Sequence, residues 1–175
     1  MIYIRIVVIS DVHGNREAFV RVMDSLKNEN IEGVALLGDL IDYGMHSNEV
    51  IEMIQSLKYP LICNLRGNHE QAIITESYDR FSSKRGSACA MYTRSVLNEN
   101  TWNYMKNIQN PSGMSEFMLE EKRCLAVHGS LEDNYWKSIF PGEDSPEYGK
   151  YDYVFSGHSH LPHYFEVFYP ADNPK

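Results

Sequence analysis

Residues 6–14 read IVVISDVHG, an apolar run that ends in a cluster of aspartate, histidine and glycine. The same arrangement recurs after VALL at Gly38-Asp39-Leu40-Ile41-Asp42, after LICNL at Arg66-Gly67-Asn68-His69-Glu70, after LAV at His128-Gly129, and after YVF at Ser156-Gly157-His158-Ser159-His160. Short runs rich in Ile, Val and Leu are typical of buried strands. Because open α/β sheets bind ligands beyond the carboxyl ends of their strands, we expect the five clusters to meet at one site.

Helical patterns alternate with the first of these strands. Residues 16–29 and 48–57 carry apolar side chains at helical spacing, and we expect Asn15 and Ser47 to cap these two helices. The predicted strands are residues 2–9, 34–37, 60–65, 116–119, 123–127, 153–155 and 164–168, of which 116–119 and 123–127 form a hairpin, and residues 70–107 are predicted to be helical with breaks near Ser82 and Asn98. This order predicts an α/β fold of layered sheets with mixed strand directions rather than a pure Rossmann unit.

The composition is that of an ordinary globular protein. A chain of 175 residues with 43% hydrophobic and 23% charged residues predicts one domain with a buried core and excludes disorder as the main description. No apolar stretch approaches the ~18 residues needed to span a bilayer, so we expect no membrane partner. Residues 1–9 contain Arg5 and lack a small-residue cleavage site, which favours a strand over a signal peptide and predicts a cytoplasmic protein.

The charge balance is acidic, because 16 Lys and Arg against 24 Asp and Glu give a net charge of −8. This charge argues against non-specific nucleic-acid binding, and an anionic substrate would need positive charge from another source. The three cysteines, Cys63, Cys89 and Cys124, are widely spaced and form no C-x-x-C pair. We therefore expect reduced thiols rather than a zinc or redox site.

Histidine is concentrated in the five clusters, which hold five of the seven histidines. Asp11 and His13 lie two positions apart, as do His158 and His160, and in extended chain both members of a pair point to one side about 6 to 7 Å apart. Carboxylate, amide and imidazole groups suit borderline divalent ions, with Mn as the first expectation and Fe, Zn, Co or Ni as alternatives. The ligands are too many for one tetrahedral zinc and suffice for two metals that share a bridge. Two such cations would supply the positive charge that the composition lacks.

Taken in order, the motifs D-x-H, G-D-x-x-D, G-N-H-E, H-G and G-H-x-H resemble those of the calcineurin-like metallophosphoesterase superfamily, over residues 2 to about 162. The resemblance implies a layered α/β/β/α sandwich with mixed β-sheets. It also implies that one metal is held by Asp11, His13, Asp39 and His160, and the second by Asp39, Asn68, His128 and His158, with Asp39 as the bridging carboxylate. In such enzymes a water or hydroxide between the metals is the nucleophile. His69 would then be the general acid, and Asp42 would hold its imidazole and favour the protonated form.

One position departs from the protein Ser/Thr phosphatases, which these motifs also resemble. Those enzymes carry arginine after the second aspartate of G-D-x-x-D, where this chain has Tyr43 and then Gly44. The Asp-Tyr-Gly form is similar to the small bacterial and archaeal branch of the superfamily, whose members hydrolyse phosphomonoesters and diesters. That branch continues after G-H-x-H with another strand, whereas this sequence stops at Lys175. We therefore expect residues 1–175 to form a single domain that is truncated or lacks its C-terminal closing strand, which leaves an unpaired sheet edge.

These observations predict a binuclear metal-dependent phosphoesterase that acts on a small phosphorylated substrate. The alternatives are a protein Ser/Thr or dinucleoside-polyphosphate phosphatase, and a scaffold that binds metal without catalysis. Tyr135 and Trp136 are candidates for a lid over the substrate or for packing, and Arg66 is expected to pack or to pair with a carboxylate. His46 and His163 lie outside the motifs and are expected at the surface or behind the ligands.

Overall fold

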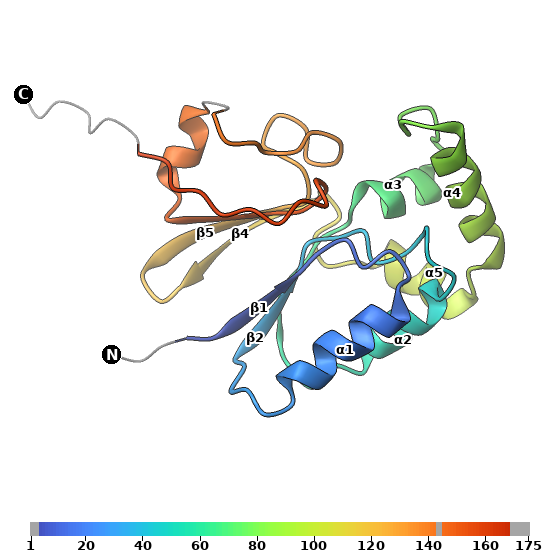
Figure 1. Ribbon diagram of the computed structural model, residues 1–175, viewed down its shortest axis with the longest axis horizontal. Coiled ribbons are helices and arrows are strands. Elements are labelled where there is room, and N and C mark those ends of the chain that lie inside the picture. The colour runs from blue at the N-terminus through green and yellow to red at the C-terminus, as the bar shows by residue number, and fades with distance from the viewer. Residues whose placement is uncertain (1–3, 143–144, 169–175) are drawn as a thin grey trace, which may run out of the picture.

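The computed structural model describes residues 4–142 and 145–168. The elements follow in the order β1 (Ile6–Ile9), α1 (Arg16–Leu26), β2 (Gly33–Leu36), α2 (Ser47–Gln55), β3 (Leu61–Asn64), α3 (Asn68–Thr75), α4 (Lys84–Val96), α5 (Glu99–Lys106), β4 (Met114–Leu119), β5 (Lys122–Val127), the 3-10 helix η1 (Pro146–Lys150) and β6 (Tyr153–Ser156). Two three-stranded sheets pack against each other, and α1 to α5 lie together on the side of the first sheet away from the second (Figure 1). None of the helices in the described residues is long and apolar enough to cross a membrane.

The two sheets differ in strand direction. The first has the order β1-β2-β3 and is wholly parallel, with Ile6 opposite Gly33 and Val34 opposite Leu61. Its strands are joined through α1 and α2, because parallel neighbours need a long crossover. In the second sheet β4 and β5 form an antiparallel hairpin, and β6 runs parallel to β5. The predicted layered α/β fold with mixed strand directions is therefore confirmed.

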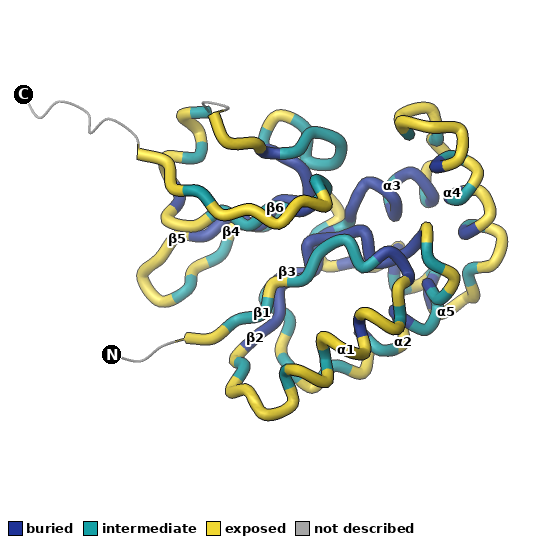
Figure 2. Tube along the Cα trace, viewed as in Figure 1, coloured by how far each residue is buried: buried dark blue, intermediate teal, exposed yellow. Residues whose placement is uncertain are grey.

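The core fills the spaces between these layers. Ala35 of β2 and Ala126 of β5 lie between the two sheets, where their small side chains allow close approach. The largest cluster lies between β2 and the helices, and the longest buried stretches of chain are residues 33–42, which begin with β2, and residues 124–130, which begin in β5 (Figure 2). Beyond the second sheet, Leu125 and Val127 pack against Ile139 and Tyr151, so residues 131–142 and 145–151 form an outer layer. In the described residues this outer layer contains η1 and no α-helix.

Helix termini mostly follow the predicted capping pattern. Asn15 caps α1, since its side chain accepts a hydrogen bond from the backbone N–H of Ala18 at 3.1 Å. The long predicted helical segment is broken into α3, α4 and α5, and Ser83 and Asn98 cap the last two. The prediction for Ser47 is wrong. This residue is the first of α2, and its buried hydroxyl instead accepts a hydrogen bond from the backbone N–H of Asp42 at 3.0 Å.

Two strand predictions need correction. Residues 164–168 form no strand, because Tyr164 and Phe168 are exposed and no described strand lies alongside to pair with them. The strand predicted for residues 2–9 begins at Ile6, and residues 2 and 3 lie outside the described part of the chain.

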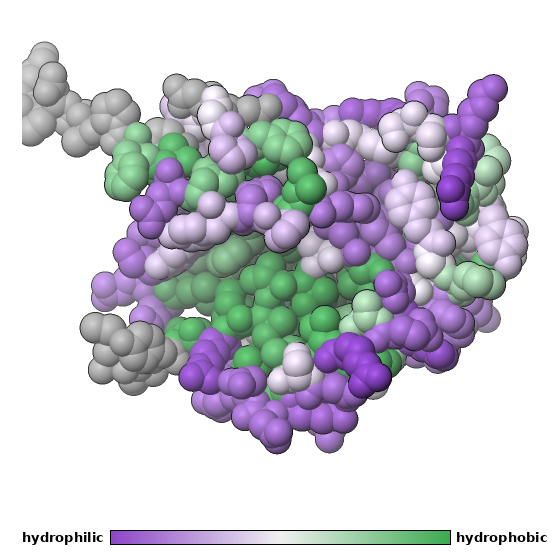
Figure 3. Space-filling view, in the orientation of Figure 1, coloured by the Kyte–Doolittle hydropathy of each residue, from purple (hydrophilic) through white to green (hydrophobic). Residues whose placement is uncertain are grey.

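One edge of the first sheet is open. Within residues 4–142 and 145–168, β1 is hydrogen-bonded to β2 on one side only, and Val8 in its middle is 37% exposed. A continuous apolar area occupies this part of the surface between the two sheets (Figure 3). The sequence predicts such an unpaired edge. The prediction of a missing closing strand concerns residues 170–174, and these lie outside the described residues.

Candidate metal centre

The structure brings the five sequence clusters to one end of the two sheets. The five clusters directly follow β1, β2, β3, β5 and β6, so these strands all deliver side chains to the same place. The nine residues predicted for the site are all present there: Asp11, His13, Asp39, Asp42, Asn68, His69, His128, His158 and His160. The arrangement expected from α/β topology is therefore what the chain forms.

One group of ligand atoms joins the ends of β1 and β6. The Nε2 atoms of His13 and His160 lie 3.0 Å apart, and His160 Nε2 lies 3.3 Å from Asp11 Oδ1. His13 Nε2 is also 3.7 Å from Asp39 Oδ2. The Nδ1–H of His13 donates to the carbonyl of Ile41 at 3.2 Å, which leaves the Nε2 lone pair directed into the group.

A second group joins the ends of β2, β3, β5 and β6. Asn68 Oδ1 lies 2.9 Å from His128 Nε2 and 3.0 Å from His158 Nδ1. His128 Nε2 lies 3.3 Å from Asp39 Oδ2, the same oxygen that faces the first group. The Nδ1–H of His128 donates to the carbonyl of Leu37 at 2.8 Å, so this imidazole also presents Nε2. Asp39 is thus the one side chain common to both groups as described.

The donor atoms of both groups fit divalent metal ions. Asp11 Oδ1 and Asp39 Oδ2 are buried and have no hydrogen-bond partner among the described residues. Buried carboxylate oxygens are costly unless they are paired or bind a cation. Within each of two sets, Asp11 with His13 and His160, and Asp39 with His128 and His158, the ligand atoms lie within 4.8 Å of one another. Carboxylate oxygens with imidazole nitrogens and an amide oxygen are the ligand types of borderline divalent ions.

The backbone at the ligands is left-handed, which corrects the expectation of extended pairs. Positive φ angles occur at seven site residues: Asp11 (54°), His13 (49°), Asp39 (52°), Asp42 (73°), Tyr43 (56°), His158 (64°) and His160 (55°). Such angles are uncommon outside glycine and cluster where a structure holds functional groups in place. Here they let the chain turn sharply after each strand. The backbone N–H of Asp11 donates to the carbonyl of Gly38 at 3.1 Å, which ties two of these turns together.

Glu70 holds the loop that carries Asp39, a role that sequence reasoning missed. Its buried carboxylate accepts backbone N–H hydrogen bonds from Gly67 (2.8 Å), Asp39 (2.9 Å), Leu40 (2.7 Å) and Ile41 (3.2 Å). Burial raises the pKa of Glu70, and the negative charge of Asp39 raises it further. The sequence signal was available, since Glu70 stands three residues after Gly67 at the start of a helix, where a carboxylate reaches back to the first turn.

Gly67 is required because Asp39 lies against it. A Cβ atom at this position would overlap the Asp39 carboxylate and its backbone nitrogen. With no side chain there, the first turn of α3 approaches Asp39, and the backbone N–H of His69 donates to Asp39 Oδ1 at 2.9 Å. One carboxylate oxygen is therefore held by the helix, and the other, Oδ2, is left to face the ligand groups.

His69 borders the ligands and is held by a buried chain of hydrogen bonds. Its Nδ1–H donates to Asp42 Oδ2 at 2.6 Å, and the hydroxyl of Thr93 donates to Asp42 Oδ1 at 2.6 Å. Burial opposes protonation of His69, but the charges of Asp39 and Asp42 outweigh it and raise its pKa above the ordinary 6.5. Thr93 was not predicted, because nothing in the sequence distinguishes this mid-helix residue of α4 from its neighbours.

The charges within the centre shift the pKa values of its other members. Burial alone would raise the pKa of Asp39, but the imidazoles of His128 and His69 lower it far below the ordinary value. Burial alone would lower the pKa of His128, whereas the Asp39 carboxylate beside it raises that pKa to about 9. Burial lowers the pKa values of His13 and His158. Asp39 is therefore ionised, and its negative charge raises the pKa values of His69 and His128.

Several other predicted residues lie around the centre without facing it. Arg66 packs, as expected, since its guanidinium donates to Gln71 Oε1 at 3.1 Å and to the carbonyl of Met105 at 3.2 Å. His46 pairs with carboxylates of the neighbouring helices. His163 lies at the surface. Tyr135 is held through its hydroxyl by a backbone carbonyl and packs there rather than over the ligands.

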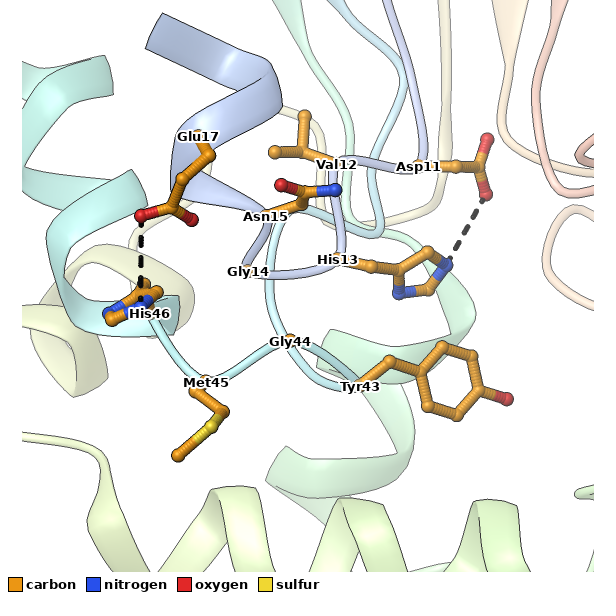
Figure 4. Close-up of a pocket in the computed structure, with 10 residues that line it drawn as sticks. All are labelled: Asp11, Val12, His13, Gly14, Asn15, Glu17, Tyr43, Gly44, Met45 and His46. Carbon is orange, nitrogen blue, oxygen red and sulfur yellow. Dashed lines mark ion pairs between the residues drawn. The ribbon is translucent and has the colours of Figure 1, made fainter.

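Two hollows open beside the centre. The first is lined by residues 11–15, Glu17 and residues 43–46, with Asp11 and His13 at one end and the ion pair of Glu17 with His46 at the other (Figure 4). The second, which we call the aromatic hollow, has a volume of about 270 Å³ and is lined by Asp39, Tyr43, Asn68, His69, Arg80, Phe81, Ser82, Trp136, His158 and His160. Tyr43 lines both hollows and lies between them.

Comparisons with known proteins show what the chain as a whole is similar to. A model of the family described as calcineurin-like phosphoesterase matches residues 4–162. An uncharacterised protein of Methanocaldococcus jannaschii is 33% identical over 167 residues, which cover 93% of this chain and 65% of that protein. A protein phosphatase 2A catalytic chain of Dictyostelium discoideum is 33% identical over 135 residues, which cover 72% of this chain and 38% of that protein. The crystal structure of a metallophosphoesterase from Sphaerobacter thermophilus has a TM-score of 0.62 at 25% identity and covers 92% of this chain and 62% of that one. This chain spans less than two thirds of the length of each of the three.

Proposed function

The chain belongs to the calcineurin-like phosphoesterase family, and from this premise we propose that it hydrolyses small phosphomonoesters or phosphodiesters with two divalent metal ions. The observation that carries the proposal is the position of Asp39 Oδ2, which lies 3.3 Å from His128 Nε2 in one ligand group and 3.7 Å from His13 Nε2 in the other. A carboxylate placed between two groups of ligands suits a pair of cations that share it.

The two ligand groups divide the proposed metal positions. Asp11, His13, Asp39 and His160 would hold one cation, and Asp39, Asn68, His128 and His158 the other. When bound, the two cations would neutralise phosphate charge and activate water for in-line attack on phosphorus. They would also provide the attraction for an anion in a chain with a net charge of −8. Mn is the ion we expect first, with Fe, Zn, Co or Ni as alternatives.

His69 is proposed as the acid that protonates the departing oxygen. Its Nδ1–H is engaged by Asp42, so the proton for the leaving group is the one on Nε2. The raised pKa of His69 favours the form of the imidazole that carries this proton. Asp42 and Thr93 are positioning residues, since they fix the imidazole and do not reach the ligand groups themselves.

The identity of residue 43 favours small esters over phosphoproteins. In this chain the position that follows Asp42 is tyrosine, and its ring lies 4.5 Å from the ring of His69. No guanidinium therefore stands at this position to grip a phosphate. The likeness to the Dictyostelium protein phosphatase keeps phosphopeptides in the test as an alternative substrate class.

The proposal is tested by a substrate screen on metal-loaded protein. Protein stripped with chelator is reloaded with Mn, Fe, Zn, Co or Ni, its metal content is measured by elemental analysis, and it is assayed on phosphomonoesters, diesters, dinucleoside polyphosphates and phosphopeptides. We expect hydrolysis of small esters that Asp39→Asn abolishes together with metal binding. Asp24→Asn, an exposed aspartate of α1 paired with Lys27, is the matched control and should change neither. A metal-loaded protein inert on the whole panel would instead support a non-catalytic scaffold, and preference for phosphopeptides would support a protein phosphatase.

A further inference from the structure

The hydrogen bonds of His69 decide which hollow receives the leaving group. Asp42 occupies Nδ1, so a departing oxygen must approach Nε2. His69 lines the aromatic hollow but not the hollow beside Asp11 and Glu17. Apart from the proposed metal ligands, that other hollow carries the carboxylate of Glu17, whereas the aromatic hollow carries the guanidinium of Arg80, which favours an anionic ester. The part of the substrate that leaves therefore lies in the aromatic hollow.

The wall of the aromatic hollow beside His69 is made of rings. Phe81 lies edge-on to His69 with ring centres 4.9 Å apart, and Tyr43 does so at 4.5 Å. Trp136 continues the wall, since its ring centre is 5.3 Å from that of Phe81 at an interplanar angle of 89°. A group bonded to the oxygen at His69 Nε2 would pass along these rings.

The wall is built from two loops that are fastened together. Phe81 belongs to the loop between α3 and α4, and Trp136 to the loop after β5. Arg80 joins them, because its guanidinium pairs with Asp133 at 2.7 Å and lies 5.1 Å from the centre of the Trp136 ring. The Asp133 carboxylate also accepts the backbone N–H of Trp136 at 3.1 Å. The indole is thus held in place without a substrate, which makes the wall a preformed surface.

From this geometry we propose that the site selects esters whose leaving group carries one flat aromatic ring, which packs against Phe81 and Trp136. The proposal rests on the phosphoesterase function proposed above. A volume of about 270 Å³ is at the small end for ligand pockets and leaves room for a phosphate and a single ring. In the reaction the bond from phosphorus to the ester oxygen breaks as the bond from phosphorus to water oxygen forms. The departing oxygen takes the His69 proton and leaves as the ring-bearing alcohol.

The test compares benzyl phosphate with cyclohexylmethyl phosphate. Both leave as primary alcohols of similar size and basicity, and only the first has a flat aromatic ring. Contacts between aromatic rings predict that wild-type protein prefers the benzyl ester by about tenfold in kcat/KM. Phe81→Leu and Trp136→Leu should each reduce that preference to about twofold or less, because they keep an apolar side chain but remove the aromatic face. Phe140→Leu, at an exposed phenylalanine that does not line the hollow, is the matched control and should keep the preference.

A binding measurement separates this inference from the proposed function. Benzylphosphonate and cyclohexylmethylphosphonate cannot be hydrolysed, and calorimetric titration of metal-loaded wild type and variants gives their Kd ratio. If neither ester is hydrolysed but the benzyl preference in Kd is present in wild type and lost in Phe81→Leu and Trp136→Leu, the inference stands and the proposed function fails. Equal kcat/KM and Kd for the two ring types in wild type, or a preference that survives both variants, would overturn the inference.

Discussion

Asp39→Asn should lower the pKa of His128 in the metal-free protein. The substitution keeps the shape of the side chain and removes its negative charge. His128 is fully buried, and its Nε2 lies 3.3 Å from Asp39 Oδ2. The pKa of His128 is raised to about 9 against the effect of burial, because the Asp39 charge favours the imidazolium. Without that charge, burial should dominate and disfavour protonation.

The distance sets the size of the change. For unit charges 3.3 Å apart, an effective dielectric constant of about 20 gives about 5 kcal/mol, or roughly three to four pKa units. We therefore expect the pKa of His128 to fall from about 9 to below about 6 in Asp39→Asn. The pH dependence of stability follows from the same shift. Because the pKa of His128 is higher in the folded state than the ordinary 6.5, its protonation stabilises the fold fully below about pH 6.5. This contribution to the unfolding free energy is lost as the pH rises through about 9. Metal-free wild type should lose stability over that window, and Asp39→Asn should lose little.

The assay is an NMR titration of the histidine ring resonances of chelator-treated protein between pH 5 and pH 10, with the His128 signals assigned from His128→Gln. Urea unfolding over the same pH range gives the second readout. Asp24→Asn is the control, because it removes an exposed aspartate charge on α1 that pairs with Lys27. The reasoning is refuted if His128 titrates at the same pH in Asp39→Asn as in wild type.

Three further predictions concern the acid, a turn and the thiols. His69→Ala should lower kcat for alkyl phosphates by about 10²- to 10⁴-fold but spare p-nitrophenyl phosphate, whose leaving group needs little proton donation. Wild-type activity on alkyl esters should fall as the pH rises above the raised pKa of His69, and the variant should not show this fall. Equal losses on both substrates would contradict the acid role. Glu120→Gly should raise the unfolding free energy by about 1 kcal/mol in urea titrations. Glu120 has a φ of 52° in the turn between β4 and β5, and glycine adopts this left-handed conformation without the cost that a side chain imposes. An equal gain from Glu121→Gly would refute this reasoning. Ellman's reagent at pH 8 should modify Cys89 in the native chain and all three cysteines in urea. Burial raises the pKa of Cys63 to about 12 and also raises that of Cys124, so neither thiol is reactive in the folded protein. If Cys63 reacted in the native chain as fast as Cys89, the prediction would be wrong.

The sequence was sufficient to predict which residues meet, because each ligand follows directly after a strand. An apolar run followed by Asp, Asn or His beside glycine is a local pattern, and parallel strands bring their carboxyl ends to one edge. The same logic predicted the two parallel crossovers and the hairpin of β4 and β5. These features depend on short stretches of chain, which periodicity and turn residues can report.

What the sequence did not predict depends on contacts between distant segments. The hydrogen bond from Thr93 to Asp42 joins α4 to the loop after β2, which lies 51 residues earlier in the chain. No local sequence pattern indicates this contact. The left-handed turns at Asp11 and His13 lie against the Gly38 loop, where the backbone N–H of Asp11 donates to the Gly38 carbonyl, and a spacing of two residues does not distinguish such turns from extended chain. Residues 164–168 are rich in the aromatic and β-branched residues that favour strands, yet strand formation also needs a neighbour, which the described residues do not provide.

The most direct test of the shared carboxylate is anomalous diffraction from crystals of the Mn-loaded protein. The account predicts two anomalous peaks per chain, about 3.5 to 4 Å apart, that both contact the Asp39 carboxylate. One peak should also contact Asp11, His13 and His160, and the other Asn68, His128 and His158. A single peak, or two peaks of which only one touches Asp39, would contradict the account.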